Sequence, residues 1–312
     1  MLTGPTLLPL KLFFDAYAGK GRPMLTRKLI VAGLLALVAL PGAGFAQDAA
    51  KPAEPAKAPE PPKPPYTLTA NVYLVSDYLF RGLTQTWGKP AIQGGADFVH
   101  DSGLYLGTWA SNVSGNQFAG GSMEWDMYGG YNYKINDDFT IGAGLYYYYY
   151  PGANFKEAAS APPGSQTYNT LEVNALATWK WLTFKVNYAL TDYFGASTVT
   201  GFTDSTKGTY YLQLDGSYPI ASVEGLSLIG HVGYTHYSKD LAAPGVNNGH
   251  TDPSYWDLKF GVSYAWKDGW TVGAYYVGTN NTDYYNPTSS LANTSTKDLG
   301  GSTGYITVGR TF

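Results

Sequence analysis

The sequence predicts an all-β fold, a single transmembrane antiparallel β-barrel of about 12 strands in residues 66–312. Beyond Tyr66, apolar and polar residues alternate repeatedly, which is the period of a β-strand with two different faces. Short and long connections between these segments also alternate, and the chain ends on an aromatic residue, Phe312. An even number of strands, with short turns at one end and longer loops at the other, is typical of bacterial outer-membrane barrels.

The composition favours strands over helices. The chain has 28 Tyr, 8 Trp, 13 Phe and 38 Gly beside only 14% charged residues. Aromatic side chains fill a pleated surface, and glycine relieves crowding where strands bend. The mean hydropathy of −0.19 is too low for a bundle of membrane helices. The lack of cysteine excludes disulfides, thiolate metal sites and cysteine nucleophiles.

Residues 1–46 are predicted to direct export as a signal peptide. A basic start at Met24 precedes an apolar run, 29–40, and a small-residue cleavage site that ends at Ala46. These are the parts of a secretory signal peptide, and the apolar run is too short to span a bilayer stably. Residues 1–23 match no part of such a signal, so we expect Met24 to be the true start.

Residues 47–65 are rich in Ala, Pro, Lys and Glu and predict a disordered linker before the barrel. Proline fixes φ and removes a hydrogen-bond donor, so this segment joins neither a helix nor a sheet. We expect an extended, semi-rigid tether. Two roles remain open for it: a spacer after signal cleavage, and a contact with peptidoglycan or a periplasmic partner.

The alternation and the turn residues divide the barrel region into strands. The predicted strands are 67–78, 91–101, 104–111, 123–134, 139–150, 168–180, 182–190, 208–218, 226–237, 255–266, 270–277 and 304–312. The connections are short at 101–103, 136–138, 180–181, 223–225 and 267–269, and long at 79–90, 112–122, 151–167, 191–207, 238–254 and 278–303. We expect the long connections outside the cell, and the short turns in the periplasm together with both ends of the barrel region.

Each predicted strand has one apolar and one polar face. In one of them, Leu258 and Phe260 alternate with Asp257 and Lys259. A Lys or Arg on the lipid face costs about 2–4 kcal/mol at the bilayer midplane, so the charged face is predicted to line the lumen. Tyrosine and tryptophan at strand ends, including the run 146–150, predict girdles at the membrane interfaces.

Charged side chains on the polar faces are candidate pore-lining residues, with one more at the first strand-to-loop corner. They are Arg81, Asp97, Glu124, Asp126, Glu172, Lys185, Asp215, Asp257 and Lys259. Carboxylates outnumber basic groups in this set, which predicts a weak preference for cations. A register shift of one residue, or ion pairs inside the lumen, would undo that preference.

The motif Phe80-Arg81-Gly82 at the first strand-to-loop corner has two interpretations. In the first, Arg81 binds loop carbonyls or a neighbouring carboxylate such as Asp77, and Gly82 supplies a backbone conformation closed to other residues. In the second, Arg81 belongs to a charged ring at the pore mouth.

Three motifs follow one another near the start of the barrel region. They are Val75-Ser-Asp-Tyr-Leu-Phe-Arg-Gly82, Pro90-Ala-Ile-Gln-Gly-Gly95 and Gly103-Leu-Tyr-Leu-Gly-Thr-Trp-Ala-Ser-Asn-Val113. In this order they resemble the opening of the TorF family of porin-like proteins of Proteobacteria, and the likeness covers about residues 67–312. The resemblance implies an outer-membrane barrel with a pore. Together with the charged lumen, it leads us to expect passive diffusion of small hydrophilic solutes. It also implies that the barrel-insertion machinery reads the strand that ends at Phe312.

The sequence shows no catalytic constellation and predicts no enzyme and no cofactor. It also predicts no metal site, because its four histidines show no metal-ligand spacing. Two further classes remain open: a structural or adhesive barrel with a closed lumen, and an outer-membrane lipid hydrolase with a Ser/His pair on its outer wall. Lipid of the outer membrane is the expected surrounding partner. Nucleic acid is not expected, since residues 66–312 carry 12 Lys and Arg against 19 Asp and Glu and repel phosphates.

Overall fold

The computed structural model of the chain describes residues 63–159, 164–242, 250–280, 282–285 and 288–312. The predicted signal peptide lies outside these residues, and the predicted linker enters them only at its last residues, 63–65. Among the described residues, no helix is long and apolar enough to cross a membrane.

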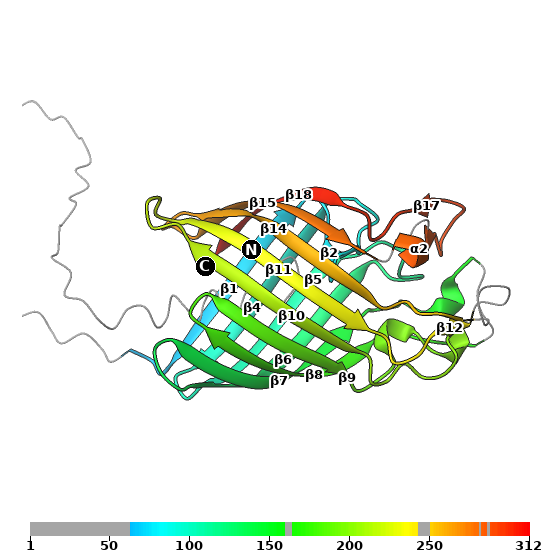
Figure 1. The fold of residues 1–312 in the computed structure, drawn as a ribbon, viewed down its shortest axis with the longest axis horizontal. Coiled ribbons are helices and arrows are strands. Elements are labelled where there is room, and N and C mark those ends of the chain that lie inside the picture. The colour runs from blue at the N-terminus through cyan, green and yellow to red at the C-terminus, as the bar shows by residue number, and fades with distance from the viewer. Residues whose placement is uncertain (1–62, 160–163, 243–249, 281, 286–287) are drawn as a thin grey trace, which may run out of the picture.

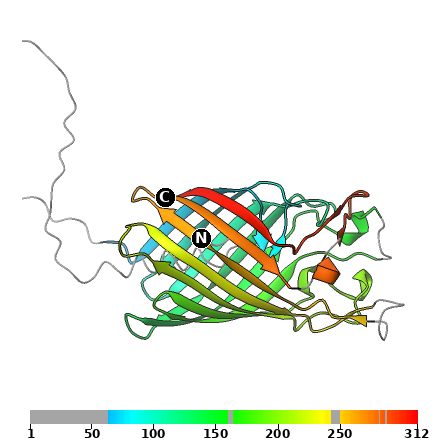
Figure 2. The same cartoon turned by 45° about the horizontal axis from the view of Figure 1, so that its top comes forward.

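Twelve strands form a closed antiparallel barrel, which confirms the predicted fold class (Figure 1, Figure 2). They are β1 (Tyr66–Val75), β4 (Ala91–His100), β5 (Leu104–Asn112), β6 (Met123–Lys134), β7 (Phe139–Tyr149), β8 (Thr170–Trp179), β9 (Leu182–Ala189), β10 (Tyr210–Pro219), β11 (Leu226–His236), β14 (Tyr255–Ala265), β15 (Trp270–Thr279) and β18 (Thr303–Thr311). Each strand pairs with the next, and β18 closes the barrel against β1, with Asn71 opposite Thr311. Closure leaves no edge strand with unpaired backbone groups, as a spanning sheet requires.

The short elements all lie in the long connections, at one end of the barrel (Figure 1). They are β2 (Leu79–Phe80), β3 (Leu83–Thr84), η1 (Phe155–Glu157), η2 (Tyr193–Gly195), η3 (Thr198–Thr200), β12 (Leu241–Ala242), β13 (His250–Thr251), α2 (Thr282–Tyr285), β16 (Thr288–Ser289) and β17 (Thr296–Lys297). The start of β1 and the end of β18 lie with the short turns at the other end, where the Asp101 amide bonds to the Pro65 carbonyl and the Thr311 amide to the Gly269 carbonyl. The predicted sorting of connections by length is therefore present in the structure.

Apolar side chains cover the outside of the barrel, and polar ones turn inward. On β14, Leu258 and Phe260 are 46% and 57% exposed, whereas Asp257 and Lys259 are 3% and 7% exposed. The same parity holds on β6, where Trp125 is exposed beside buried carboxylates. An apolar exterior of this kind suits contact with lipid.

The predicted interfacial girdle at residues 146–150 is wrong for three of its five tyrosines. Tyr146, Tyr148 and Tyr150 are only 3%, 0% and 2% exposed and point into the barrel. A run of identical residues gives no contrast between faces, so the alternation of the backbone alone decides which rings turn inward. The inward rings pack with one another and with side chains from the long connections.

Candidate functional site in the barrel lumen

Every candidate charged residue singled out from the sequence lies inside the barrel. Each is at most 8% exposed. Arg81 lies in the connection 76–90, and the others lie on β4, β6, β8, β9, β10 and β14. The lumen is therefore lined with ionisable groups that are closely packed in this state.

The connection 76–90 folds into the barrel as a tight hairpin, here called the inner hairpin. Its arms are β2 and β3, with Phe80 paired to Leu83 across the two-residue tip Arg81-Gly82. Both tip residues have positive φ, 48° and 79°. Positive φ at both central positions is the requirement of a type I′ turn, which joins antiparallel strands without splaying them.

Hydrogen bonds inside the inner hairpin hold its base. The Asp77 carboxylate accepts bonds from the hydroxyls of Thr84 at 2.6 Å and Thr86 at 2.9 Å. The Thr86 hydroxyl in turn accepts a bond from the Tyr78 amide at 3.1 Å. Asp77 is therefore engaged within the hairpin, and the expectation that it pairs with Arg81 is wrong.

Arg81 instead reaches Glu172 on β8. Its Nη1 and Nη2 donate to Oε1 and Oε2 of Glu172 at 2.9 Å and 2.8 Å, a bidentate ion pair with both side chains at most 3% exposed. Nη1 also donates to the Tyr193 hydroxyl at 2.8 Å. The guanidinium carbon lies 4.3 Å from the ring centre of Tyr211. A planar guanidinium group can form a bidentate pair with a carboxylate and stack on an aromatic ring at the same time, as Arg81 does here.

The inner hairpin crosses the lumen near the end that carries the long connections. It leaves from β1, and β8 is five strands away in one direction around the barrel and seven in the other, so Arg81 meets nearly the opposite wall. On the way, Tyr78 packs edge-on to Trp109 and Phe80 to Tyr148. A cavity of about 40 Å³ remains between the hairpin tip and the wall of β10, β11 and β14. That volume holds only a few water molecules.

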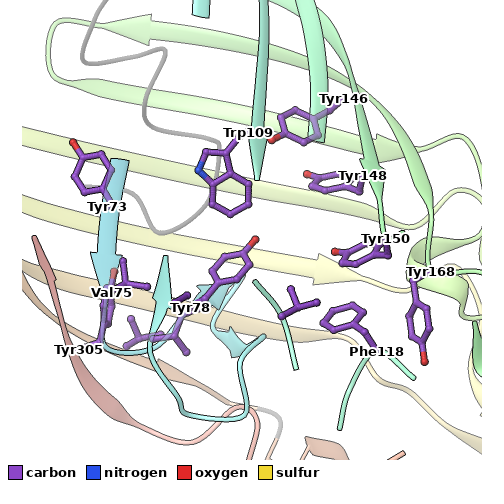
Figure 3. Packing of buried hydrophobic residues seen from close by; sticks show 14 of the residues in the cluster. Tyr73, Val75, Tyr78, Trp109, Phe118, Tyr146, Tyr148, Tyr150, Tyr168 and Tyr305 are labelled. Atoms are coloured by element: carbon purple, nitrogen blue, oxygen red, sulfur yellow. The ribbon is translucent and has the colours of Figure 1, made fainter. Parts of the chain in front are cut away.

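Inward tyrosines lie against the carboxylates on β4 and β6, Asp97, Glu124 and Asp126, here called the acidic wall of the lumen. Figure 3 shows Tyr146, Tyr148 and Tyr150 one above another on the same side of their chain segment, with Tyr78 of the inner hairpin facing this row. Tyr78 is fully buried, and this burial together with the nearby carboxylates of Glu124 and Asp126 raises the pKa of its phenol well above the usual value. The hairpin thus places a neutral phenol against the acidic wall.

A family model described as "Bacterial protein of unknown function (Gcw_chp)" matches residues 59–312, the whole barrel. The chain belongs to the Gcw_chp family. The likeness to the TorF family remains a prediction from the motifs. No curated protein sequence is significantly similar to this Gcw_chp member.

Several solved structures are similar to this Gcw_chp member at low sequence identity. The KdgM porin is 12% identical with a TM-score of 0.43, over 78% of this chain and 99% of that one. The NanC porin is also 12% identical with a TM-score of 0.43, over 79% and 99%. OccAB2 of Acinetobacter baumannii is 14% identical with a TM-score of 0.38, over 72% and 55%.

In the lumen of this chain, the basic groups lie on the wall formed by β8 to β14, together with three carboxylates. His231 on β11 contacts Asp215 through Nδ1 at 2.7 Å and Asp257 through Nε2 at 2.9 Å. Carboxylates only accept hydrogen bonds, so the geometry suits an imidazolium that donates from both nitrogens. Lys259 lies opposite His231 in the strand register. With Arg81 paired to Glu172, each of the three carboxylates on this wall has a basic partner.

The remaining carboxylates lie on β4 and β6, where the neighbours are phenols. Tyr128 donates to Asp97 at 2.6 Å, and Tyr146 donates to Asp126 at 2.9 Å. Glu124 is 1% exposed beside Asp126 on the same face. Among the described residues, no Lys, Arg or His forms an ion pair with these three carboxylates.

Sequence reasoning missed His231, Tyr193 and Tyr211 as members of the lumen site. His231 could have been found, because the pairing register of β10, β11 and β14 puts Asp215, His231 and Lys259 side by side at inward positions. Tyr193 carries no such signal, since it comes from the irregular connection that contains η2. The described residues contain no group of three or more His, Asp or Glu side chains arranged to hold a metal ion.

Proposed function

We propose that this chain is a porin-like channel of the Gram-negative outer membrane that passes small hydrophilic solutes by passive diffusion, and that the inner hairpin closes it at rest. One observation carries the proposal: a closed barrel with an apolar exterior encloses a wall of charged side chains. Burying charges is costly, so a lumen that served only as a hydrophobic core would not favour them. If water fills the lumen when the inner hairpin leaves, these charges become solvated and the cost of burying them disappears.

A structural or adhesive barrel with a closed lumen is the second candidate. The packing of the inner hairpin favours it, because Tyr78 and Leu79 are 0% and 2% exposed and the cavity beside the hairpin tip is small. The two candidates differ in whether the hairpin ever leaves.

Conductance of the purified protein in planar bilayers separates these candidates. Arg81→Ala removes the contact of the hairpin tip with β8, and Lys156→Ala, on the exposed side of the η1 connection, is the matched control. We expect rare discrete openings in the wild type and in Lys156→Ala, and openings at least about tenfold more frequent in Arg81→Ala, since the lost buried pair is worth more than 1.4 kcal/mol. Silence of all three proteins under all voltages would favour the closed barrel.

The lipid-hydrolase alternative gains no support from the described histidines. Both nitrogens of His231 face carboxylates, so neither remains to activate a serine hydroxyl. His100, the last residue of β4, contacts Ser102 in the turn that follows, which is a local contact between residues two positions apart.

Insertion is proposed to depend on Phe312, which is 65% exposed at the end of β18. Deleting it removes the terminal aromatic group and the two backbone hydrogen bonds between Phe312 and Ala70 of β1, while the pairing of residues 303–311 with β1 and β15 remains. We expect precursor to accumulate in the periplasm and the heat-modifiable folded form to decrease in outer-membrane fractions. Normal yields of folded barrel would contradict this role.

A further inference from the structure

The guanidinium of Arg81 occupies a site whose walls come from other parts of the chain. Glu172 supplies the carboxylate, Tyr193 a hydroxyl acceptor and Tyr211 an aromatic face. We call these three residues the guanidinium box. Arg81 enters it from the tip of a hairpin whose chain continues into β1 and β4 at its base and whose Thr84 amide bonds to the Leu299 carbonyl at 3.0 Å.

The box is held in shape by contacts that do not involve Arg81. Glu172 Oε2 accepts a bond from the Tyr148 hydroxyl at 3.3 Å. The Tyr193 amide donates to the Thr206 hydroxyl at 2.9 Å, which fixes the η2 turn. The Tyr211 hydroxyl donates to Asp257 at 3.0 Å. Withdrawal of the hairpin would leave a preformed site whose buried carboxylate has lost its bidentate partner.

We infer that the guanidinium box is a binding site for external solutes that carry a guanidinium or primary ammonium group, and that Arg81 is its internal occupant. The inference rests on the proposed channel only for the route by which a solute arrives. Glu172 is 1% exposed, and a buried carboxylate without a cation is strongly unfavourable, so a replacing cation is attracted. A planar guanidinium group can donate both hydrogen bonds to the Glu172 carboxylate at once. An ammonium group carries the same charge but cannot form this bidentate pair.

Competition with Arg81 limits access to the box in the wild type. A tethered group acts at an effective concentration in the millimolar range, so a free solute must exceed that level or arrive when the hairpin has left. The charge of Lys185 on β9 also acts on Glu172. Among the ion pairs of the described residues, however, Lys185 forms none with Glu172, so it does not replace the lost pair.

Thermal unfolding of Arg81→Ala in detergent tests the box without any need for conductance. Ethylguanidinium resembles the deleted end of the side chain, and ethylurea has a similar shape without the charge. At a concentration ten times its Kd, we expect ethylguanidinium to raise the Tm of Arg81→Ala by about 3 °C. Wild type with ethylguanidinium, and Arg81→Ala with ethylurea, should show no shift.

Two further variants make the result specific. Arg81→Ala with Glu172→Gln should lose the shift, because the carboxylate is gone. Arg81→Gln, which keeps the length of the hairpin tip side chain, replaces Arg81→Ala if that protein does not fold. An equal shift with and without Glu172, or no shift at millimolar concentrations in either Arg81 variant, would overturn the inference. A rise in Tm with ethylguanidinium in a protein that shows no conductance would support the guanidinium box and count against the channel. Conductance without a rise in Tm would support the channel and count against the box.

Discussion

At the scale of single residues, the ion pair between Arg81 and Glu172 decides whether the inner hairpin stays in the lumen. Both groups are buried, and each satisfies the other through two hydrogen bonds. Removing one partner of a buried pair leaves a desolvated charge, which costs about 3–5 kcal/mol, whereas removing both costs less. The pair therefore links the stability of the fold to the closure of the lumen.

Glu172→Gln should lower the free energy of unfolding by about 3 kcal/mol, because the Arg81 charge loses its partner. Urea unfolding followed by tyrosine and tryptophan fluorescence measures this change. Glu157→Gln is the matched control, since Glu157 is half-exposed and 3.7 Å from Lys156, and its change should stay below about 1 kcal/mol. The double variant with Arg81→Ala should be more stable than Glu172→Gln alone. Equal losses in Glu172→Gln and Glu157→Gln would contradict a stabilising role of the pair.

Gly82→Ala should displace the hairpin tip. Gly82 has a φ of +79°, and an added Cβ would lie 2.7 Å from the Cβ of Asp257 and 2.6 Å from the Cγ2 of Thr279. We expect more frequent channel openings than in the wild type, measured in planar bilayers at one voltage. Gly230→Ala is the control, because no heavy atom lies within 4 Å of its added Cβ. Similar gating in both variants would argue against close packing of the tip.

At the scale of elements, local patterns predicted the strands well but not the inner hairpin. All twelve strands agree with the predicted ranges within three residues at each end. The largest difference is in β1, which ends at Val75 because Asp77 bonds to Thr84 and Thr86 and turns the chain inward. Alternation and turn residues are local signals. The contact of Arg81 with Glu172 joins residues 91 positions apart, and no local pattern reports it.

The sorting of connections predicts the orientation of the barrel in the membrane. The turn that contains Asp268 should face the periplasm, and the connection that contains Thr294 should face the outside. Because the chain has no cysteine, Asp268→Cys and Thr294→Cys each introduce one thiol. An impermeant maleimide applied to whole cells should label Thr294→Cys and leave Asp268→Cys unlabelled until the cells are opened. The reverse pattern would invert the proposed topology.

At the scale of the whole molecule, the charges of the lumen divide into two walls. The wall of β8 to β14 sets three basic groups of its own, Lys185, His231 and Lys259, against three carboxylates, Glu172, Asp215 and Asp257, and Arg81 of the inner hairpin adds a fourth positive charge in the closed state. On the wall of β4 and β6, Asp97 and Asp126 accept hydrogen bonds from phenols, and no basic group among the described residues forms an ion pair with the carboxylates there. From the sequence alone, these charges could be assigned to the lumen but not divided into two walls. The division depends on ion pairs between strands, which form only in the closed barrel.

A weak cation preference should therefore depend on Asp97, Glu124 and Asp126 alone. When the inner hairpin leaves, water reaches these carboxylates, and their charge raises the local concentration of cations. Reversal potentials under a KCl gradient measure the preference. It should fade at 1 M salt, where screening acts over about 3 Å. Glu124→Gln with Asp126→Asn should move the reversal potential towards zero, while Asp101→Asn in an exposed turn leaves it unchanged. Anion preference in the wild type, or equal selectivity in all variants, would refute the acidic wall as the selective element and leave the barrel and its hairpin unaffected.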